Sequence, residues 1–295
     1  MESLAPSPSN STSSMKNIVM GDGFLSQLLL ALAAVFAIFF LFLSFEFFYS
    51  SISNVTGRNI ELFPFTASSE DKQVVIRQDI KKYPQGKQIP FSVNERSGAE
   101  FSYSFYLYVN PSTFNNSDTL ATVFYKGYLS PWPLMGPGVF LKRNTNTLRV
   151  FMNSYTNPYM YCDIENIPVS KWFHVVVSVR KNSMEVYVNG NLTKKMTFEN
   201  GMPYQNFQDL VIFNQSNFTL RGSTTPALGE ETFEVRGVFK GNLSALTYFS
   251  YALSYTEIQS LMNMGPSKKV LSATQELPPY FADQWWTTSY TKTEA

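Results

Sequence analysis

Strict alternation of apolar residues along one short segment is the feature that most limits what this chain can fold into. The odd-numbered positions of Trp172–Arg180 form an unbroken apolar row, Phe173, Val175, Val177 and Val179. Successive side chains of a strand point to opposite faces, so this row predicts a β-strand that is half-buried. The positions between are mixed and include His174.

The residues that follow predict two more strands. Asn189-Gly190 separates the segments Glu185–Val188 and Leu192–Phe198. Both residues of an Asn-Gly pair tolerate positive φ, which makes the pair the strongest short signal for a hairpin. The whole stretch therefore predicts three antiparallel strands, one face of which belongs to a core.

Short apolar runs separated by Gly, Asn and Pro continue on both sides of this stretch. Such punctuation predicts an all-β antiparallel sandwich or barrel. The best runs lie at 72–80, 100–109, 121–127, 138–143, 148–153, 209–213, 233–241 and 243–249.

One short helix interrupts the strands near the end of the domain. Ser254 followed by Glu257 predicts a capping box, and Leu253 with Ile258 fits a hydrophobic staple. Gly265, which Pro266 follows, predicts where the helix stops. We expect a C-terminal helix of about ten residues that packs on the sandwich.

Composition excludes several classes of function. The 295 residues carry a formal net charge of +1, with no basic cluster of the kind that nucleic acid requires, so no nucleic-acid partner is expected. With one cysteine, Cys162, and one histidine, a disulfide framework and a zinc site are both excluded. We expect no metal, no cofactor and no catalytic residues.

The N-terminal part differs in character. Residues 1–23 are rich in Ser, Pro and Asn and predict a disordered tail. Leu28–Phe45 is then uncharged, which predicts a transmembrane helix over 24–48, against the alternatives of a signal peptide or a buried helix. The flanking charges leave its orientation open. The residues expected to form the membrane anchor are Phe24, Leu28, Leu32, Val35, Phe39, Phe42 and Phe45.

The remaining chain divides into a neck over 49–88, a sandwich over 89–266 and an aromatic tail over 267–295. In the tail, Tyr280, Phe281, Trp285 and Trp286 follow a Pro-Pro pair, and we expect them to contact a protein partner or to pack on their own domain. Six Asn-x-Ser/Thr sequons that follow the anchor are candidate glycosylation sites, or else ordinary loop residues: Asn54, Asn115, Asn191, Asn214, Asn217 and Asn242.

Three ordered segments resemble one known superfamily. Glu100–Pro111, Lys171–Leu192 and Gly241–Gly265 are similar to an early aromatic strand, a Trp strand with Tyr-Val-Asn-Gly, and a closing helix. These are features of the concanavalin A-like lectin/glucanase superfamily, in its laminin-G/pentraxin-like branch. The resemblance covers Ile89–Pro266 and implies a two-sheet antiparallel jelly-roll sandwich. The anchor together with "SVNERSGAEFSYSFYLYV" also resembles membrane-anchored members encoded by large icosahedral double-stranded DNA viruses.

The residues favour binding over catalysis. A glycosidase needs two carboxylates across a cleft, and the Glu-x-Asp-x-x-Glu motif of the superfamily's glucanases is absent. Asp163 and Glu165 are the nearest pair, and we interpret them as a solvated strand end. His174 and Ser178 share a strand face but lie too far apart to form a catalytic pair.

Two functions from different classes remain. The first is a membrane-anchored structural or interaction protein, a minor virion component that links an internal membrane to capsid proteins. The alternative is a membrane-anchored, lectin-like adhesion protein that binds carbohydrate, since many aromatic residues are available to stack on sugars. Those considered for stacking are Tyr103, Tyr106, Tyr108, Tyr125, Tyr128 and Trp132.

Overall fold

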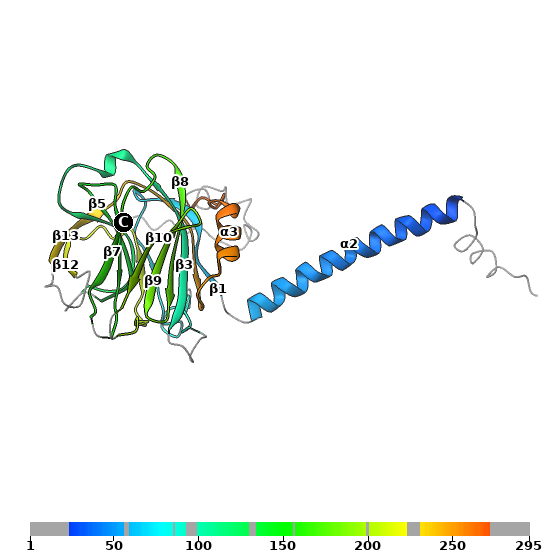
Figure 1. Cartoon of the computed structure of the whole chain (residues 1–295), viewed down its shortest axis with the longest axis horizontal. Helices are drawn as coiled ribbons and strands as arrows, with labels where there is room; N and C mark the ends of the chain where they lie inside the picture. Colours follow the sequence, from blue (N-terminus) through cyan, green and yellow to red (C-terminus); the bar gives the residue numbers. More distant parts are fainter. Residues whose placement is uncertain are drawn as a thin grey trace, which may run out of the picture. The chain divides into compact units, whose positions relative to one another are not determined.

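The computed structural model describes residues 24–55, 59–84, 86–92, 99–129, 134–155, 157–198, 201–222 and 231–271. The chain divides into two units, Met1–Gly57 and Arg58–Ala295. The first contributes one helix and the second contains the strands (Figure 1).

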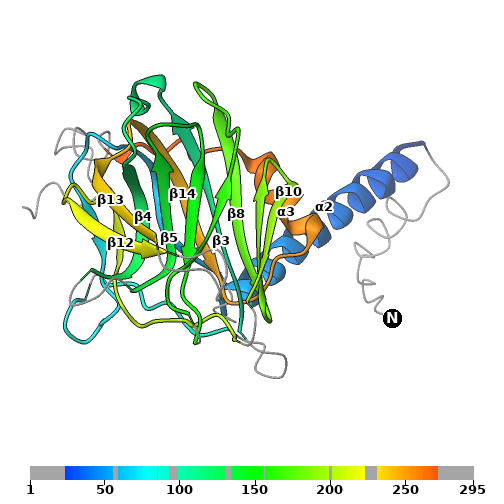
Figure 2. The ribbon, with the colours of Figure 1, turned by 60° about the vertical axis from the view of Figure 1, so that its left-hand side comes forward.

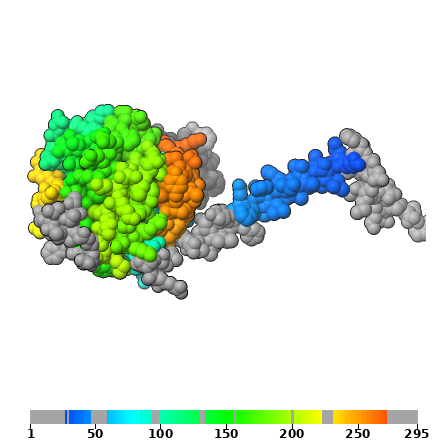
Figure 3. Space-filling model, viewed as in Figure 1, coloured from blue at the N-terminus to red at the C-terminus, as the bar shows by residue number. Residues whose placement is uncertain are grey.

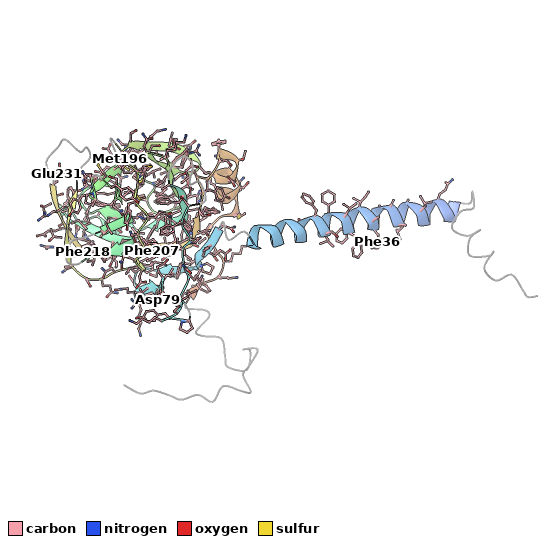
Figure 4. All side chains as sticks on the ribbon, turned by 90° about the horizontal axis from the view of Figure 1, so that it is seen from below. Phe36, Asp79, Met196, Phe207, Phe218 and Glu231 are labelled. Atoms are coloured by element: carbon pink, nitrogen blue, oxygen red, sulfur yellow. The ribbon has the colours of Figure 1, made fainter. Side chains whose placement is uncertain are left out.

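The helix of the first unit, α2, spans Phe24–Val55 over 32 residues. Six consecutive apolar side chains, Ile38–Leu43, are all exposed. Because successive residues of a helix lie about 100° apart, these six surround the helix with apolar surface. Phe36 is one of the exposed side chains that project from it (Figure 4). Within the described residues, no helix is both long enough and apolar enough to cross a membrane.

The expected anchor residues fall on this helix. Leu28, Leu32, Val35, Phe39, Phe42 and Phe45 are exposed, whereas the side chain of Phe24 lies outside the described residues.

Two sheets form the second unit, as the sequence predicts (Figures 1 and 2). The pairings among the described residues are antiparallel apart from β13–β4. Sheet A has six strands in the order β1 (Asn59–Ser68), β14 (Gly241–Phe249), β3 (Glu100–Val109), β8 (Trp172–Arg180), β9 (Ser183–Val188) and β10 (Asn191–Thr197). Sheet B has eight strands. Six follow the order β12 (Phe218–Gly222), β13 (Glu231–Val238), β4 (Leu120–Tyr128), β5 (Leu134–Lys142), β6 (Leu148–Met152) and β7 (Met160–Ile164). In addition, β11 (Leu210–Ile212) pairs with β4, and β2 (Val74–Ile76) pairs with β11.

The main core lies between the sheets and takes alternate residues of the central strands, such as the odd-numbered residues 101–109 of β3 and 173–179 of β8. Phe105 of β3 and Phe124 of β4 are both fully buried, with ring centroids 5.0 Å apart in an edge-to-face pair. Each such aromatic removes roughly 150–250 Å² from water, so burial of this layer is the largest favourable contribution to the fold.

The β8 strand is buried on both faces, which corrects the expectation of a half-buried strand. Phe173 and its alternating partners face the core, while Val176 on the other face joins a second apolar cluster with Ile258 of α3 (Tyr255–Met264). Figure 3 shows α3 in orange beside the green and yellow-green strands. The helix has the predicted capping box at Ser254 and ends at Gly265, whose φ is +73°.

The sequence analysis places residues 49–88 in a neck outside the sandwich. For the residues that the structure describes after position 58, this assignment changes. The β1 strand is the edge of sheet A and pairs with β14, and β2 pairs with β11 of sheet B. The alternation of β1 is hidden in the sequence because its register shifts on either side of Phe63. These residues therefore belong to the sandwich.

Candidate functional site

An aromatic groove opens at one end of the sandwich, where the loop before β3, the end of β6 and the loop between β10 and β11 meet. Its volume is about 500 Å³, in the range of small-molecule sites. Figure 4 labels Phe207, one of its aromatic residues. The groove is lined by Phe91, Ser92, Ala99, Tyr155, Met202, Pro203, Tyr204, Gln205 and Phe207.

Two edge-to-face aromatic pairs make up much of this surface. Phe91 and Phe207 have ring centroids 4.4 Å apart with planes at 81°. Tyr155 and Tyr204 have centroids 5.2 Å apart with planes at 71°. Tyr155 is 72% exposed, Phe207 65% and Phe91 51%. Exposed aromatic rings are unfavourable in water, and most large apolar side chains of this domain are buried. Several exposed rings gathered in one place therefore indicate a binding surface.

Buried polar groups hold the loop between β10 and β11, which carries Tyr204 and Phe207, on one side of the groove. Asn153 is 1% exposed, and its Nδ2 donates to the backbone oxygen of Tyr204 over 3.0 Å. The backbone NH of Tyr204 donates in turn to the backbone oxygen of Asn153 over 2.9 Å. Gln205 donates to the Tyr248 hydroxyl over 2.7 Å and accepts from the backbone NH of Ser92 over 2.8 Å. These bonds join the three segments that carry the aromatic pairs.

Lys126 of β4 holds the same loop from the other side. It is 3% exposed, and its Nζ donates to the backbone oxygens of Asn206 and Gln208 and to Asn206 Oδ1. Asn206 Nδ2 donates back to the backbone oxygen of Lys126 over 3.0 Å. Burial lowers the pKa of Lys126 to about 8, and the charge of Asp209 acts in the opposite direction.

The position of Phe207 follows from these contacts. Its two neighbours, Asn206 and Gln208, are both fixed to Lys126, so the backbone between them is fixed as well. A side chain that is exposed on a rigid backbone presents its ring at little cost in entropy when a ligand binds. The arrangement can therefore act as a preformed platform for ring stacking.

His174 lies elsewhere, on the face of sheet A that α3 covers. Its Nε2 is 2.8 Å from Ser104 Oγ, and its ring centroid is 4.7 Å from that of Tyr106. The buried Nδ1 has no hydrogen-bond partner among the described residues, and burial lowers the pKa of His174 to about 4. The ring is therefore neutral at pH 7. Ser178, which the sequence places on the same face, bonds to Ser102 instead, over 3.0 Å.

The carboxylate pair that the sequence singles out is not assembled as a catalytic pair. Arg149 donates from Nε and Nη2 to both oxygens of Asp163, over 2.6 and 2.7 Å. The guanidinium also lies over the ring of Tyr161, 4.1 Å from its centroid. Asp163 is thus fixed in a bidentate ion pair, and no contact joins it to Glu165 in the described part of the chain.

The other predicted residues are dispersed. Tyr103, Tyr106 and Tyr125 are buried, so they do not supply the stacking surface expected of them, while Tyr108 and Tyr128 are partly buried. Trp132 and the tail residues Tyr280, Phe281, Trp285 and Trp286 lie outside the described residues, as does the side chain of Asn54. Among the sequons, Asn115, Asn191 and Asn217 are exposed, Asn242 is half-buried, and Asn214 is buried and donates to the Tyr125 hydroxyl over 3.1 Å.

Sequence reasoning missed the groove because its residues come from irregular loops without a period. The available signal was the segment Pro203–Phe207, in which two aromatic residues follow a proline outside any alternating run. In the described residues, no group of three or more His, Cys, Asp or Glu side chains is placed to hold a metal ion.

The solved structures that match this chain share little sequence with it. The binding domain of botulinum neurotoxin serotype D is 14% identical, with a TM-score of 0.45, over 68% of this chain and 41% of that one. The binding domain of Paraclostridial Mosquitocidal Protein 1 is also 14% identical, with a TM-score of 0.44, over 68% and 42%. Trypanosoma rangeli sialidase is 13% identical, with a TM-score of 0.36, over 56% and 22%. The chain thus spans about two fifths of the length of the first two, and none of these likenesses bears on what it binds.

No curated protein matches this sequence. The family model Laminin_G_3, described as the concanavalin A-like lectin/glucanases superfamily, matches residues 85–259, which is more than half of the chain. The match overlaps most of Ile89–Pro266, over which the sequence resembles this superfamily. The chain belongs to the concanavalin A-like lectin/glucanase superfamily.

Proposed function

We propose that the sandwich is a carbohydrate-binding module and that the aromatic groove is its binding site. The observation that carries the proposal is the pair of exposed edge-to-face aromatic contacts, held in place by buried polar groups. The apolar C–H face of a pyranose ring removes water from an aromatic face on stacking, while its hydroxyls bond to polar groups nearby. Membership of a superfamily that includes lectins is consistent with this function.

Binding without hydrolysis fits the groove better than catalysis does. Its described lining contains no Asp or Glu side chain, whereas glycoside hydrolysis uses two carboxyl groups on either side of the bond. The polar side chains of the described lining are those of Ser92, Tyr155, Tyr204 and Gln205. They can orient a sugar by hydrogen bonding, but they include no group of the kind that glycosidases use as general acid.

Removing the two most exposed rings of the groove should weaken glycan binding strongly without unfolding the domain. We expect Tyr155→Ala combined with Phe207→Ala to weaken binding on the order of a hundredfold, because each ring supplies roughly 1–2 kcal/mol of stacking. A glycan array would identify a ligand, and calorimetry would then measure its affinity for both proteins. Surface substitutions of this kind change stability by about 0.5 kcal/mol or less.

Tyr255→Ala is the matched control, since this tyrosine is 65% exposed on α3 and does not line the groove. Its affinity should equal that of the unaltered protein. Equal binding by the double variant would show that the groove is not the site.

We also propose that the module is attached to a membrane through the N-terminal helix. The uncharged run Leu28–Phe45 and the exposed apolar side chains of α2 support this attachment, since such a surface is unfavourable in water. The anchor expected over 24–48 includes residues whose side chains lie outside the described part. A role between an internal membrane and a capsid rests on the sequence resemblance alone and stays a prediction.

Membrane attachment predicts a simple fractionation result. After extraction with alkaline carbonate, the full-length protein should remain in the membrane pellet, because an inserted apolar helix does not depend on charge for retention. A variant with Phe39→Lys and Phe42→Lys should move to the supernatant. Release of the unaltered protein by carbonate would contradict the proposal.

A further inference from the structure

We infer that the aromatic groove selects neutral oligosaccharides over anionic ones such as sialylated or sulfated glycans. This inference rests on the proposed carbohydrate-binding function and specifies its ligand. It follows from the charge, the hydrogen-bonding capacity and the aromatic geometry of the described lining.

The described lining of the groove is uncharged. None of its residues is Asp, Glu, Lys, Arg or His. The Gln205 amide already donates to Tyr248 and accepts from Ser92, which leaves one N–H for a ligand. The remaining polar side-chain groups of the described lining are the hydroxyls of Ser92, Tyr155 and Tyr204. These neutral groups can hydrogen-bond to the hydroxyls of a neutral sugar, but they offer no ionic partner to a carboxylate or sulfate.

Lys126, the cation behind the loop, is not available to compensate an anion. It is 3% exposed and absent from the lining, and its Nζ already donates to three oxygen atoms of Asn206 and Gln208. An ammonium group has three donors, so these contacts use its full capacity. An anionic sugar in the groove would lose hydration without gaining an ion pair from the described lining, which costs free energy.

The aromatic geometry favours a ligand of more than one sugar. In each pair the two rings are close to perpendicular, at 81° and 71°, so each pair presents a ring face beside a ring edge. Each pair combines one residue of the Pro203–Phe207 segment with a residue of another segment, Phe91 or Tyr155, and the two pairs form two stacking positions. A single pyranose covers one such position, so a second sugar residue adds contact area at the other.

The experiment compares matched ligands on the full-length protein in nanodiscs, which contain no glycoside detergent to compete for the groove. Lactose, its trisaccharide extensions and 3′-sialyllactose form one matched set, and maltose, maltotriose and their sulfated forms another. We expect each neutral oligosaccharide that binds to do so on the order of tenfold more tightly than its charged form. Lactose and maltose should also bind more tightly than the monosaccharides galactose and glucose, which complete the two sets.

Met202→Lys tests the charge argument directly, because this side chain lines the groove and is 48% exposed. The new ammonium group should reduce the preference for neutral ligands several-fold. Lys194→Met is the control, because Lys194 is exposed on β10 and does not line the groove, and it should leave the preference unchanged. The inference would be wrong if the sialylated ligand bound as tightly as lactose or more tightly and if Phe207→Ala removed that binding. The proposed carbohydrate-binding function would still hold in that case. Absence of binding to every glycan would instead overturn the proposed function.

Discussion

Replacing Lys126 by Met should lower the free energy of unfolding by about 2–4 kcal/mol at neutral pH. Met fills a similar volume but cannot donate, so the backbone oxygens of Asn206 and Gln208 would lose this donor, whereas the Asn206 amide oxygen keeps the backbone NH of Gln208. Each buried acceptor left unsatisfied costs roughly 1–3 kcal/mol, which exceeds what is regained by no longer burying an ammonium group. Urea unfolding measures the difference.

Ligand binding gives a second measurement on the same variant. Because Phe207 lies between the two residues that Lys126 holds, release of the loop should also weaken glycan binding in the groove. Lys194→Met is the control for both measurements, since Lys194 is exposed on β10. Unchanged stability and unchanged binding in the Lys126 variant would show that this lysine does not position the loop.

The pH dependence of the same comparison has a definite sign. Burial lowers the pKa of Lys126 from 10.5 to about 8, so between these values the unfolded chain holds a proton that the folded protein has released. The free energy of unfolding therefore rises with pH across this window, and the gain is lost as pH falls through about 8. The stability difference between the unaltered protein and Lys126→Met should accordingly be larger at about pH 10 than at about pH 7.

Elements with a regular period could be predicted from the sequence. The three strands β8–β10 and the helix α3 follow from alternation, an Asn-Gly turn and a capping box, all of which are local signals. In the structure Asn189 and Gly190 have φ values of 48° and 76°, as the hairpin turn requires. Such elements are specified within a few residues of chain, so their prediction needs no knowledge of tertiary contacts.

Other strands could not be predicted because their pattern is interrupted or short. β1 contains register shifts around Phe63, and β12 is a strand of 5 residues whose burial depends on packing against β13. The burial of Lys126 is a stronger case. A lysine in the run "ATVFYKG" is typical of a solvated strand end, yet its oxygen partners lie 80 and 82 residues further along the chain.

The candidate site was predicted less well than the fold for the same reason. The groove combines residues near positions 91, 155 and 205, and nothing in any one of these segments indicates that the others lie beside it. The Ser104–His174 contact likewise depends on the register of β3 against β8, which the sequence does not give. The sequence did place His174 on a sheet face, and the structure confirms this position.

The second large expected effect is a loss of stability at low pH, when His174 is protonated. His174 is the one histidine of the chain, so this effect has a single source among the imidazoles. Burial lowers its pKa from 6.5 to about 4 in the folded protein. Between these values the unfolded chain binds a proton that the folded protein does not, so the stability due to this group is fully present above 6.5 and is lost as pH falls through about 4. The shift corresponds to a decrease of about 3 kcal/mol in the free energy of unfolding. The imidazole signals in an NMR titration of the folded protein should stay in the neutral form until the pH approaches 4.

His174→Gln separates this effect from the titration of carboxylates in the same range. The Gln side chain can place a polar atom close to the position of Nε2 and keep the contact with Ser104 Oγ, but it does not titrate. Burial raises the pKa values of Glu185 and Glu257, but their hydrogen bonds outweigh it and lower both values overall. Both groups therefore also destabilise the protein as pH falls, and both remain in the variant. The unaltered protein should therefore lose more stability than His174→Gln between pH 6.5 and 4. Two results would contradict this account: equal losses of stability in the two proteins, or an imidazole that titrates near 6.5. Either would mean that α3 opens readily and lets His174 reach water. A ring that stays buried under the helix has no partner among the described residues for a proton on Nδ1, so it should resist protonation.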